Sequence, residues 1–76
     1  GAQAPPVADA PPPGFAPDRV DKFLTEVRVA IKKGATLANL RAKAVERLAV
    51  QPEQRKKIEL LFEYAEKRLK GEGLIH

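Results

Sequence analysis

The sequence has no cysteine and no serine, and its only histidine, His76, is the last residue. Without cysteine the chain can form no disulfide, no zinc–thiolate site and no thiol nucleophile. Without serine it lacks the nucleophile of a Ser-His-Asp triad, and no glycine-rich phosphate loop, HExxH pair or acidic metal loop is present. We therefore expect no catalytic residue, no metal site and no cofactor, and we predict that the chain is not an enzyme.

Glutamates in the last third of the chain are the remaining candidates for acid–base chemistry. Glu63 and Lys67 are four residues apart, as are Glu66 and Lys70. On a helix this is the spacing of a surface ion pair, worth about 0.2–0.5 kcal/mol. We interpret this set, together with Glu59, as a solvated helix face and not as a catalytic group.

Long apolar runs are also absent. No run approaches the roughly 20 residues that span a bilayer. Residues 1–17 have neither the charged start nor the apolar middle of a signal peptide. We expect a soluble protein with no membrane partner, and the lack of cysteine is typical of the cytoplasm.

The chain is basic, with 14 Lys and Arg against 10 Asp and Glu and a net charge of +4. A basic balance favours an anionic partner, such as nucleic acid or an acidic protein surface. The alternative is that the charges serve only solubility and helix capping. The sequence leaves both open.

Residues 1–17 contain six of the seven prolines and one charged residue, Asp9. Such a segment forms no stable helix or sheet, and we predict a flexible Pro/Ala-rich linker that is partly polyproline II. Phe15 lies close enough to the first predicted helix to fold back over its start. The composition suggests a domain tethered within a larger protein, with a proline-recognition peptide at Pro11–Pro13 as the alternative.

The clearest helical pattern runs from Gln51 to Gly71. Its apolar residues recur at steps of three and four, which places them on one side of a helix. They are Ile58, Leu61, Phe62, Ala65 and Leu69. Pro52 suits a first helical position, and Gly71 is expected to close the helix in the left-handed conformation. We predict a helix over 52–70 with an apolar face broad enough to contact two neighbours.

Two further helices are predicted, over 18–33 and 36–49. Asp18 and Thr36 are their expected N-caps, and Gly34 is expected to end the first. The apolar positions of the first are Val20, Phe23, Leu24, Val27 and Ile31, and those of the second are Leu37, Leu40, Ala44 and Leu48.

Three helices joined by short connections predict an all-α fold, a small up-down-up three-helix bundle over 18–71 with a short tail at 72–76. The expected core consists of leucine, isoleucine, valine and the three phenylalanines. A domain of this size buries only about 60% of its unfolded surface. We therefore expect a small core and marginal stability.

The first functional hypothesis is a non-catalytic protein–protein interaction or docking module. Its partner would be another protein or another domain of the parent assembly, and the linker would set its reach. The candidate partner-binding residues are the apolar ones left over once a three-helix core is closed. They are Val29, Leu60, Leu74 and Ile75. The alternative is that these are scattered surface residues with no role.

The second hypothesis is nucleic-acid binding. The stretch from Ala44 to Ile58 resembles the helix-turn-helix motif of bacterial regulators, with apolar residues and a turn at matching positions. Val45, Ala49 and Arg55 depart from that motif, which has a small residue, a glycine and an aliphatic residue there. The resemblance implies that the start of the last helix enters the major groove. The residues that would face DNA are Gln54, Arg55, Lys56 and Lys57.

A second basic surface is expected from topology. In an up-down-up bundle the end of the first helix, the start of the second and the end of the third meet at one pole. The basic residues expected there are Lys32, Lys33, Arg41, Lys67, Arg68 and Lys70. They would contact phosphates, unless most of them only complement helix C-termini, at about 0.3–1 kcal/mol each.

Overall fold

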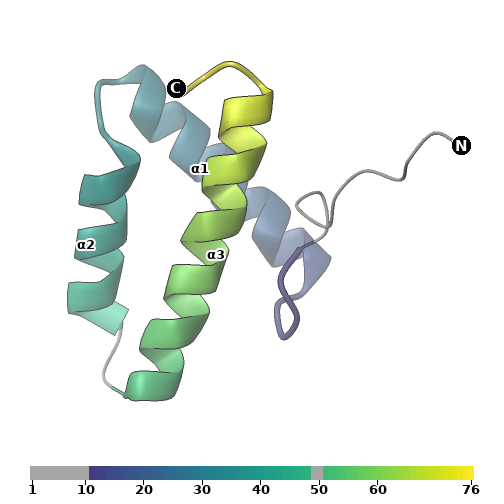
Figure 1. Ribbon diagram of the computed structural model, residues 1–76, viewed down its shortest axis with the longest axis vertical. Helices are drawn as coiled ribbons and strands as arrows, with labels where there is room; N and C mark the ends of the chain where they lie inside the picture. The colour runs from purple at the N-terminus through teal and green to yellow at the C-terminus, as the bar shows by residue number, and fades with distance from the viewer. Residues whose placement is uncertain (1–10, 49–50) are drawn as a thin grey trace, which may run out of the picture.

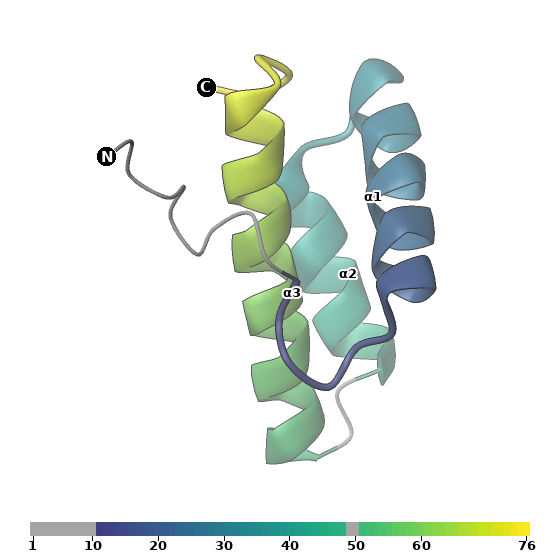
Figure 2. The same cartoon turned by 90° about the vertical axis from the view of Figure 1, so that its right-hand side faces the viewer.

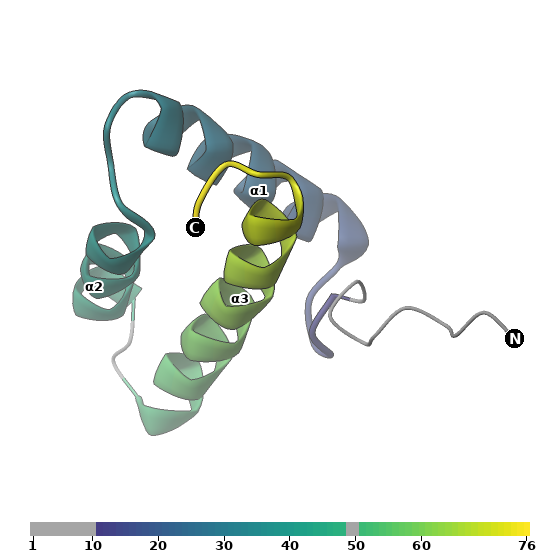
Figure 3. The same ribbon diagram turned by 45° about the horizontal axis from the view of Figure 1, so that its top comes forward.

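The computed structural model describes residues 11–48 and 51–76 and contains three helices, α1 (Pro17–Lys32), α2 (Leu37–Leu48) and α3 (Pro52–Gly71), with no strand in these ranges. The expected all-α three-helix fold is confirmed. Figure 1 shows α2 and α3 side by side and nearly antiparallel, while α1 crosses behind α3 obliquely. Figure 3 shows the same crossing with the top of the molecule turned forward. Most of the predicted linker (1–10), the predicted end of the second helix at Ala49 and the turn residue Val50 lie outside the described residues.

The segment before α1 is partly held by the folded domain. Gly14 adopts a left-handed backbone with φ +91, which favours glycine because other residues meet steric strain there. The half-buried ring of Phe15 then packs against the core cluster, and Figure 2 shows this segment passing from the start of α1 to the front of α3. Phe15 therefore contacts the core although it precedes residue 18, where the sequence predicts that the bundle starts.

Prolines begin two of the helices. Pro17 and Pro52 occupy the first helical positions of α1 and α3, each after an extended residue, Ala16 or Gln51. The expectation for Pro52 is confirmed, but Asp18 is not the N-cap of α1 and lies in its first turn. Pro17 starts the helix because its missing N–H and fixed φ suit that position. The Asp18 carboxylate then lies near the positive end of the helix dipole.

The connection from α1 to α2 follows the expected chemistry. Gly34 has φ +107, and the N–H of Ala35 donates to the carbonyl of Ala30 at 3.0 Å, which is the Schellman ending of a helix. Thr36 caps α2, since its hydroxyl oxygen accepts a hydrogen bond from the N–H of Asn39 at 3.2 Å. These two devices set the sharp reversal between the helices.

The end of α3 differs from the prediction. Gly71 is the last helical residue, Glu72 is the C-cap, and the left-handed residue is Gly73 with φ +78. The N–H of Leu74 donates to the carbonyl of Leu69 at 3.0 Å, completing a second Schellman ending. Either glycine can adopt the left-handed conformation, and the later one does so here. The longer helix carries Glu72 to the position where α1 can bind it.

The core lies between α1 and α3. Its central cluster joins Val20 and Leu24 of α1 to Tyr64 and Ala65 of α3, and none of these is more than 8% exposed. The partly buried residues packed around this cluster are Phe15, Phe23, Leu37 and Leu61. In the part of the chain that the structure describes, no buried side-chain nitrogen or oxygen lacks a hydrogen-bond partner. The α1–α3 contact is therefore a satisfied apolar core.

The second helix contributes no buried residue. It packs chiefly along α3, yet its apolar stripe is only half-buried at Leu40, Ala44 and Val45, and Leu48 is 62% exposed. The sequence predicted that this stripe would enter the core. Instead, the bundle is closed between α1 and α3 and open between α1 and α2.

We expect Leu24→Ala and Leu48→Ala to change the free energy of unfolding by very different amounts, although they remove the same atoms. Leu24 is 1% exposed, so its truncation should lower the free energy of unfolding by about 2–5 kcal/mol. Leu48→Ala should change it by less than about 0.5 kcal/mol, as exposed positions do. Urea unfolding followed by circular dichroism measures both. A large loss from Leu48→Ala would show that α2 is packed in solution.

Candidate functional site

An open apolar groove of about 430 Å³ lies between α1 and α2. We call it the α1–α2 groove. Its apolar lining residues are Phe23, Val27 and Ala30 from α1, Leu40, Ala44 and Leu48 from α2, and Phe62 from α3. The groove exists because the stripe of α2 faces α1 without being covered by it.

Two aromatic rings fix the side of the groove nearest α1. The rings of Phe23 and Phe62 meet edge to face, with centroids 5.1 Å apart and planes at 85°. Such a pair adds about 0.5–1.5 kcal/mol beyond the area it buries. Phe62 is 6% exposed, whereas Phe23 is only half-buried. The pair therefore holds one aromatic ring at the groove surface in a set orientation.

The rim of the groove is basic. Its charged lining residues are Glu26 on α1 and Lys43 and Arg47 on α2. A shallow depression that shares Glu26 with the groove adds Arg19 and Lys22. None of these five forms an ion pair with another described residue. Four cations against one carboxylate give the rim a net charge of +3 around an apolar floor.

The predicted docking residues Val29 and Leu60 lie elsewhere. They are 47% and 40% exposed. Each is nine residues from a buried residue of its own helix, Val20 and Leu69 respectively, and nine residues make two and a half helical turns. Val29 and Leu60 therefore point away from the core, on the outer faces of two different helices. The structure does not bring them together.

Leu74 and Ile75, the other two predicted docking residues, follow the end of α3 and are half-buried. The backbone of Leu74 is held by Leu69, as described above. The sequence missed the α1–α2 groove because its lining residues carry the same periodicity as core residues. Only the length and alanine content of α2 hinted that this helix fills less space than its neighbours.

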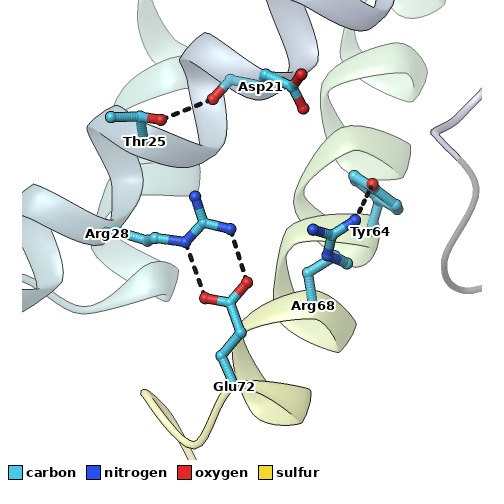
Figure 4. A network of polar contacts seen from close by, with 6 residues as sticks. All are labelled: Asp21, Thr25, Arg28, Tyr64, Arg68 and Glu72. Carbon is cyan, nitrogen blue, oxygen red and sulfur yellow. Dashed lines mark hydrogen bonds and ion pairs between the residues drawn. The ribbon is translucent and has the colours of Figure 1, made fainter.

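The predicted basic pole contains a carboxylate that sequence reasoning overlooked. Nε and Nη2 of Arg28 donate to the two carboxylate oxygens of Glu72 at 2.8 and 2.6 Å (Figure 4). This bidentate pair links α1 to the end of α3. The hydrogen bonds from Arg28 lower the pKa of Glu72, against a smaller opposing effect of burial, and the charges of Arg28, Arg68 and Lys32 lower it further. The pKa of Arg28 is raised by the same pairing.

Arg68 has a structural role at this pole. Its Nη1 donates to the hydroxyl of Tyr64 at 2.9 Å (Figure 4), and its guanidinium carbon lies 5.8 Å from the centre of the Tyr64 ring. Lys70 pairs with Glu66 at 3.5 Å, as the sequence spacing predicted. The predicted phosphate contacts at this pole are therefore partly neutralised or occupied.

Of the remaining predicted basic residues of the pole, Lys32 lies near enough to Glu72 for its charge to lower the pKa of that carboxylate. Lys33 is the C-cap of α1, and Lys32 and Lys67 are exposed. Arg41 lies on the second turn of α2, where Nη2 is 4.0 Å from a carboxylate oxygen of Glu59 on α3. Arg41 is thus part of the α2–α3 face and not of the pole.

The two helices on either side of the predicted helix-turn-helix junction, α2 and α3, are nearly antiparallel (Figure 1). Figure 2 shows α2 and α3 lying alongside each other, whereas helices of that motif cross at roughly 90–120°. Gln54, Lys56 and Lys57 are exposed at the start of α3. Nε of Arg55 is 3.4 Å from a carboxylate oxygen of Glu59. Lys56 and Lys57 are thus accessible, but α3 does not have the crossing angle to α2 that a recognition helix has to its preceding helix.

Within residues 11–48 and 51–76 no cluster of three or more His, Cys, Asp or Glu side chains could hold a metal ion. None of the helices described has the length and apolarity needed to cross a membrane. No protein-family model matches the chain, and no curated protein and no solved structure matches it at a significant level.

The Arg28–Glu72 pair predicts a pH dependence of stability. The pKa of Glu72 is lower in the folded state than in the unfolded chain. The stability that the pair contributes is therefore fully present above the unfolded pKa of about 4.3, and it is lost as the pH falls through the folded pKa. Glu72→Gln should cost no more than about 1 kcal/mol at pH 7, because the pair is partly exposed. That cost should shrink below about pH 4.

Urea unfolding at several pH values measures this difference, with Glu63→Gln as the matched control. Glu63 is exposed and forms no ion pair with a described residue. A cost of Glu72→Gln that stays constant from pH 7 to pH 3 would contradict the assignment.

Proposed function

We propose that this chain is a non-catalytic protein-docking module whose binding surface is the α1–α2 groove. The observation that carries the proposal is that α2 buries no residue while its apolar stripe lines an open groove. The partner is another protein or another domain of the same assembly. This replaces Val29, Leu60, Leu74 and Ile75, the residues favoured by the sequence, with a surface that the fold assembles from all three helices.

The physical reason is the apolar surface that the bundle leaves uncovered. Leu48 at 62% exposure and the half-buried Phe23 and Leu40 lie within one concavity, and covering apolar area stabilises a complex by about 25 cal/mol per Å². Binding energy concentrates where such residues fill a concave, desolvated site. The groove meets that description better than two single residues on separate outer faces.

The segment before Phe15 serves as the tether in this proposal. Phe15 packs against the core cluster that joins α1 to α3, so the tether is attached at the side of the molecule where the core is closed. A proline- and alanine-rich tether keeps a docking module near its partner and raises the effective concentration of the groove.

Nucleic-acid binding is the second candidate, and one observation favours it. Lys56 and Lys57 are exposed at the first turns of α3 and have no ion-pair partner among the described residues. Free cations near a helix start are suited to phosphate contacts. The near-antiparallel arrangement of α2 and α3 and the pairing of Arg55 with Glu59 weigh against reading of bases.

Site-specific photocross-linking tests the docking proposal. With a benzoylphenylalanine at position 48 we expect cross-links to a protein in the native host, because this position lies in the groove. The same probe at position 60 is the matched control, since Leu60 is also exposed but lies outside it. Cross-links at 60 alone, or at neither position, would refute docking through the groove.

Anisotropy of a labelled random-sequence duplex at two salt concentrations tests the second candidate. A nucleic-acid-binding domain should lose more than about tenfold in affinity as salt rises from roughly 50 to 200 mM. Lys56→Glu combined with Lys57→Glu should abolish this binding, and Leu48→Asp should leave it unchanged. The docking proposal predicts the opposite for binding of the protein partner, which Leu48→Asp should weaken and the double lysine variant should leave unchanged.

A further inference from the structure

We propose that the occupant of the α1–α2 groove is the apolar face of an acidic amphipathic helix belonging to the partner. This inference rests on the proposed docking function and specifies the chemistry of its ligand. The length and walls of the groove, the charge of its rim and the surface of the chain itself each support it.

The length of the groove fits a short helix. Its lining on α2 runs from Leu40 to Leu48, eight residues apart, which is about 12 Å along a helix axis. Two turns of a helix from the partner would span that distance, with apolar residues at i, i+3 or i+4, and i+7. Packing between α1 and α2 would complete a four-helix arrangement at ordinary interaxial distances of about 8–10 Å.

The walls also favour a helix over an extended segment. Both walls are helices, whose backbone N–H and C=O groups are paired within the helix except at the ends. An extended segment would find no strand edge here, since the described residues contain no strand, and would place its own unpaired backbone against apolar side chains at a cost. A helix satisfies its own backbone and presents only side chains.

The basic charge of the rim favours a ligand that carries acidic residues on either side of its apolar stripe. Arg19, Lys22, Lys43 and Arg47 outnumber the single carboxylate of Glu26. Asp or Glu residues beside the apolar stripe of the ligand would meet these cations. Such complementarity raises the association rate and makes it sensitive to salt. A basic amphipathic helix would face the same cations at a like-charge penalty.

A second copy of this chain is a poorer occupant. In a two-fold pair the same basic rim would face itself, and like charges across an interface are unfavourable. No described helix offers a stripe for insertion either, because the large apolar residues exposed outside the groove are Val29 and Leu60, one on each of two helices. The ligand therefore comes from a different segment or protein.

Titration of the isotope-labelled full chain with three synthetic peptides tests this inference. The first is an alanine-based helix of about 14 residues, with leucines at i, i+4 and i+7 and glutamates beside them. The second replaces each glutamate with lysine, and the third has the composition of the first with leucines spread around the helix. We expect the first to bind at least about tenfold more tightly than either control, with amide shifts at Phe23, Ala44 and Leu48.

Two variants locate the site. Leu48→Asp should weaken binding of the acidic peptide by at least about tenfold, since it places a carboxylate on the apolar wall. Leu60→Asp makes the same change at an exposed position outside the groove and should leave the affinity unchanged. Equal binding of the lysine peptide or of the peptide with spread leucines would overturn the inference, as would insensitivity to Leu48→Asp.

The photocross-linking probe at position 48 also separates this inference from the docking function, through the identity of the partner segment that it captures. A cross-link to an acidic amphipathic helix supports both. A cross-link to a basic or extended segment leaves the docking function standing and refutes the inference. A cross-link to a second copy, together with a dimer in sedimentation equilibrium that Leu48→Asp dissociates, also refutes it. The absence of any cross-link refutes both.

Discussion

The packing of α1 against α3 is the interaction on which the rest of the structure depends. Val20 and Leu24 of α1 are buried in one cluster with Tyr64 and Ala65 of α3, and burial of apolar side chains is the main favourable term in the folding of a small domain. Because α1 crosses α3 obliquely (Figure 1), it cannot also cover the whole of α2. The closed core on one side and the open groove on the other are two results of the same crossing.

The helix boundaries that the sequence predicted well are those with one strong local determinant. Pro52, Thr36 and Gly34 each act through their own backbone or side chain, and the structure uses them as expected. The predictions that Asp18 is an N-cap and that Gly71 is the left-handed residue were wrong. Pro17, next to Asp18, starts α1 instead, and Gly73 adopts the left-handed conformation in place of Gly71. Local chemistry identifies the candidates at a boundary, and packing chooses among them.

The candidate site was less predictable, for a different physical reason. Periodicity shows which side of a helix is apolar, but it does not show what covers that side. Leu24 and Leu48 occupy equivalent places in their stripes, yet one is 1% and the other 62% exposed. The pairing of Arg28 with Glu72 was equally hidden, since the two residues are 44 positions apart and meet only because α3 runs to Gly71.

The lack of buried side chains in α2 has a consequence for local stability. An element held by half-buried contacts opens at a smaller free-energy cost than the elements that form the core. Its backbone amides would exchange with solvent through that opening while α1 and α3 stay folded. A ligand that fills the groove supplies α2 with the burial it lacks, so ligand binding and the rigidity of this helix are thermodynamically coupled. The helix that buries no residue is thus the one whose order would report on binding of the proposed partner.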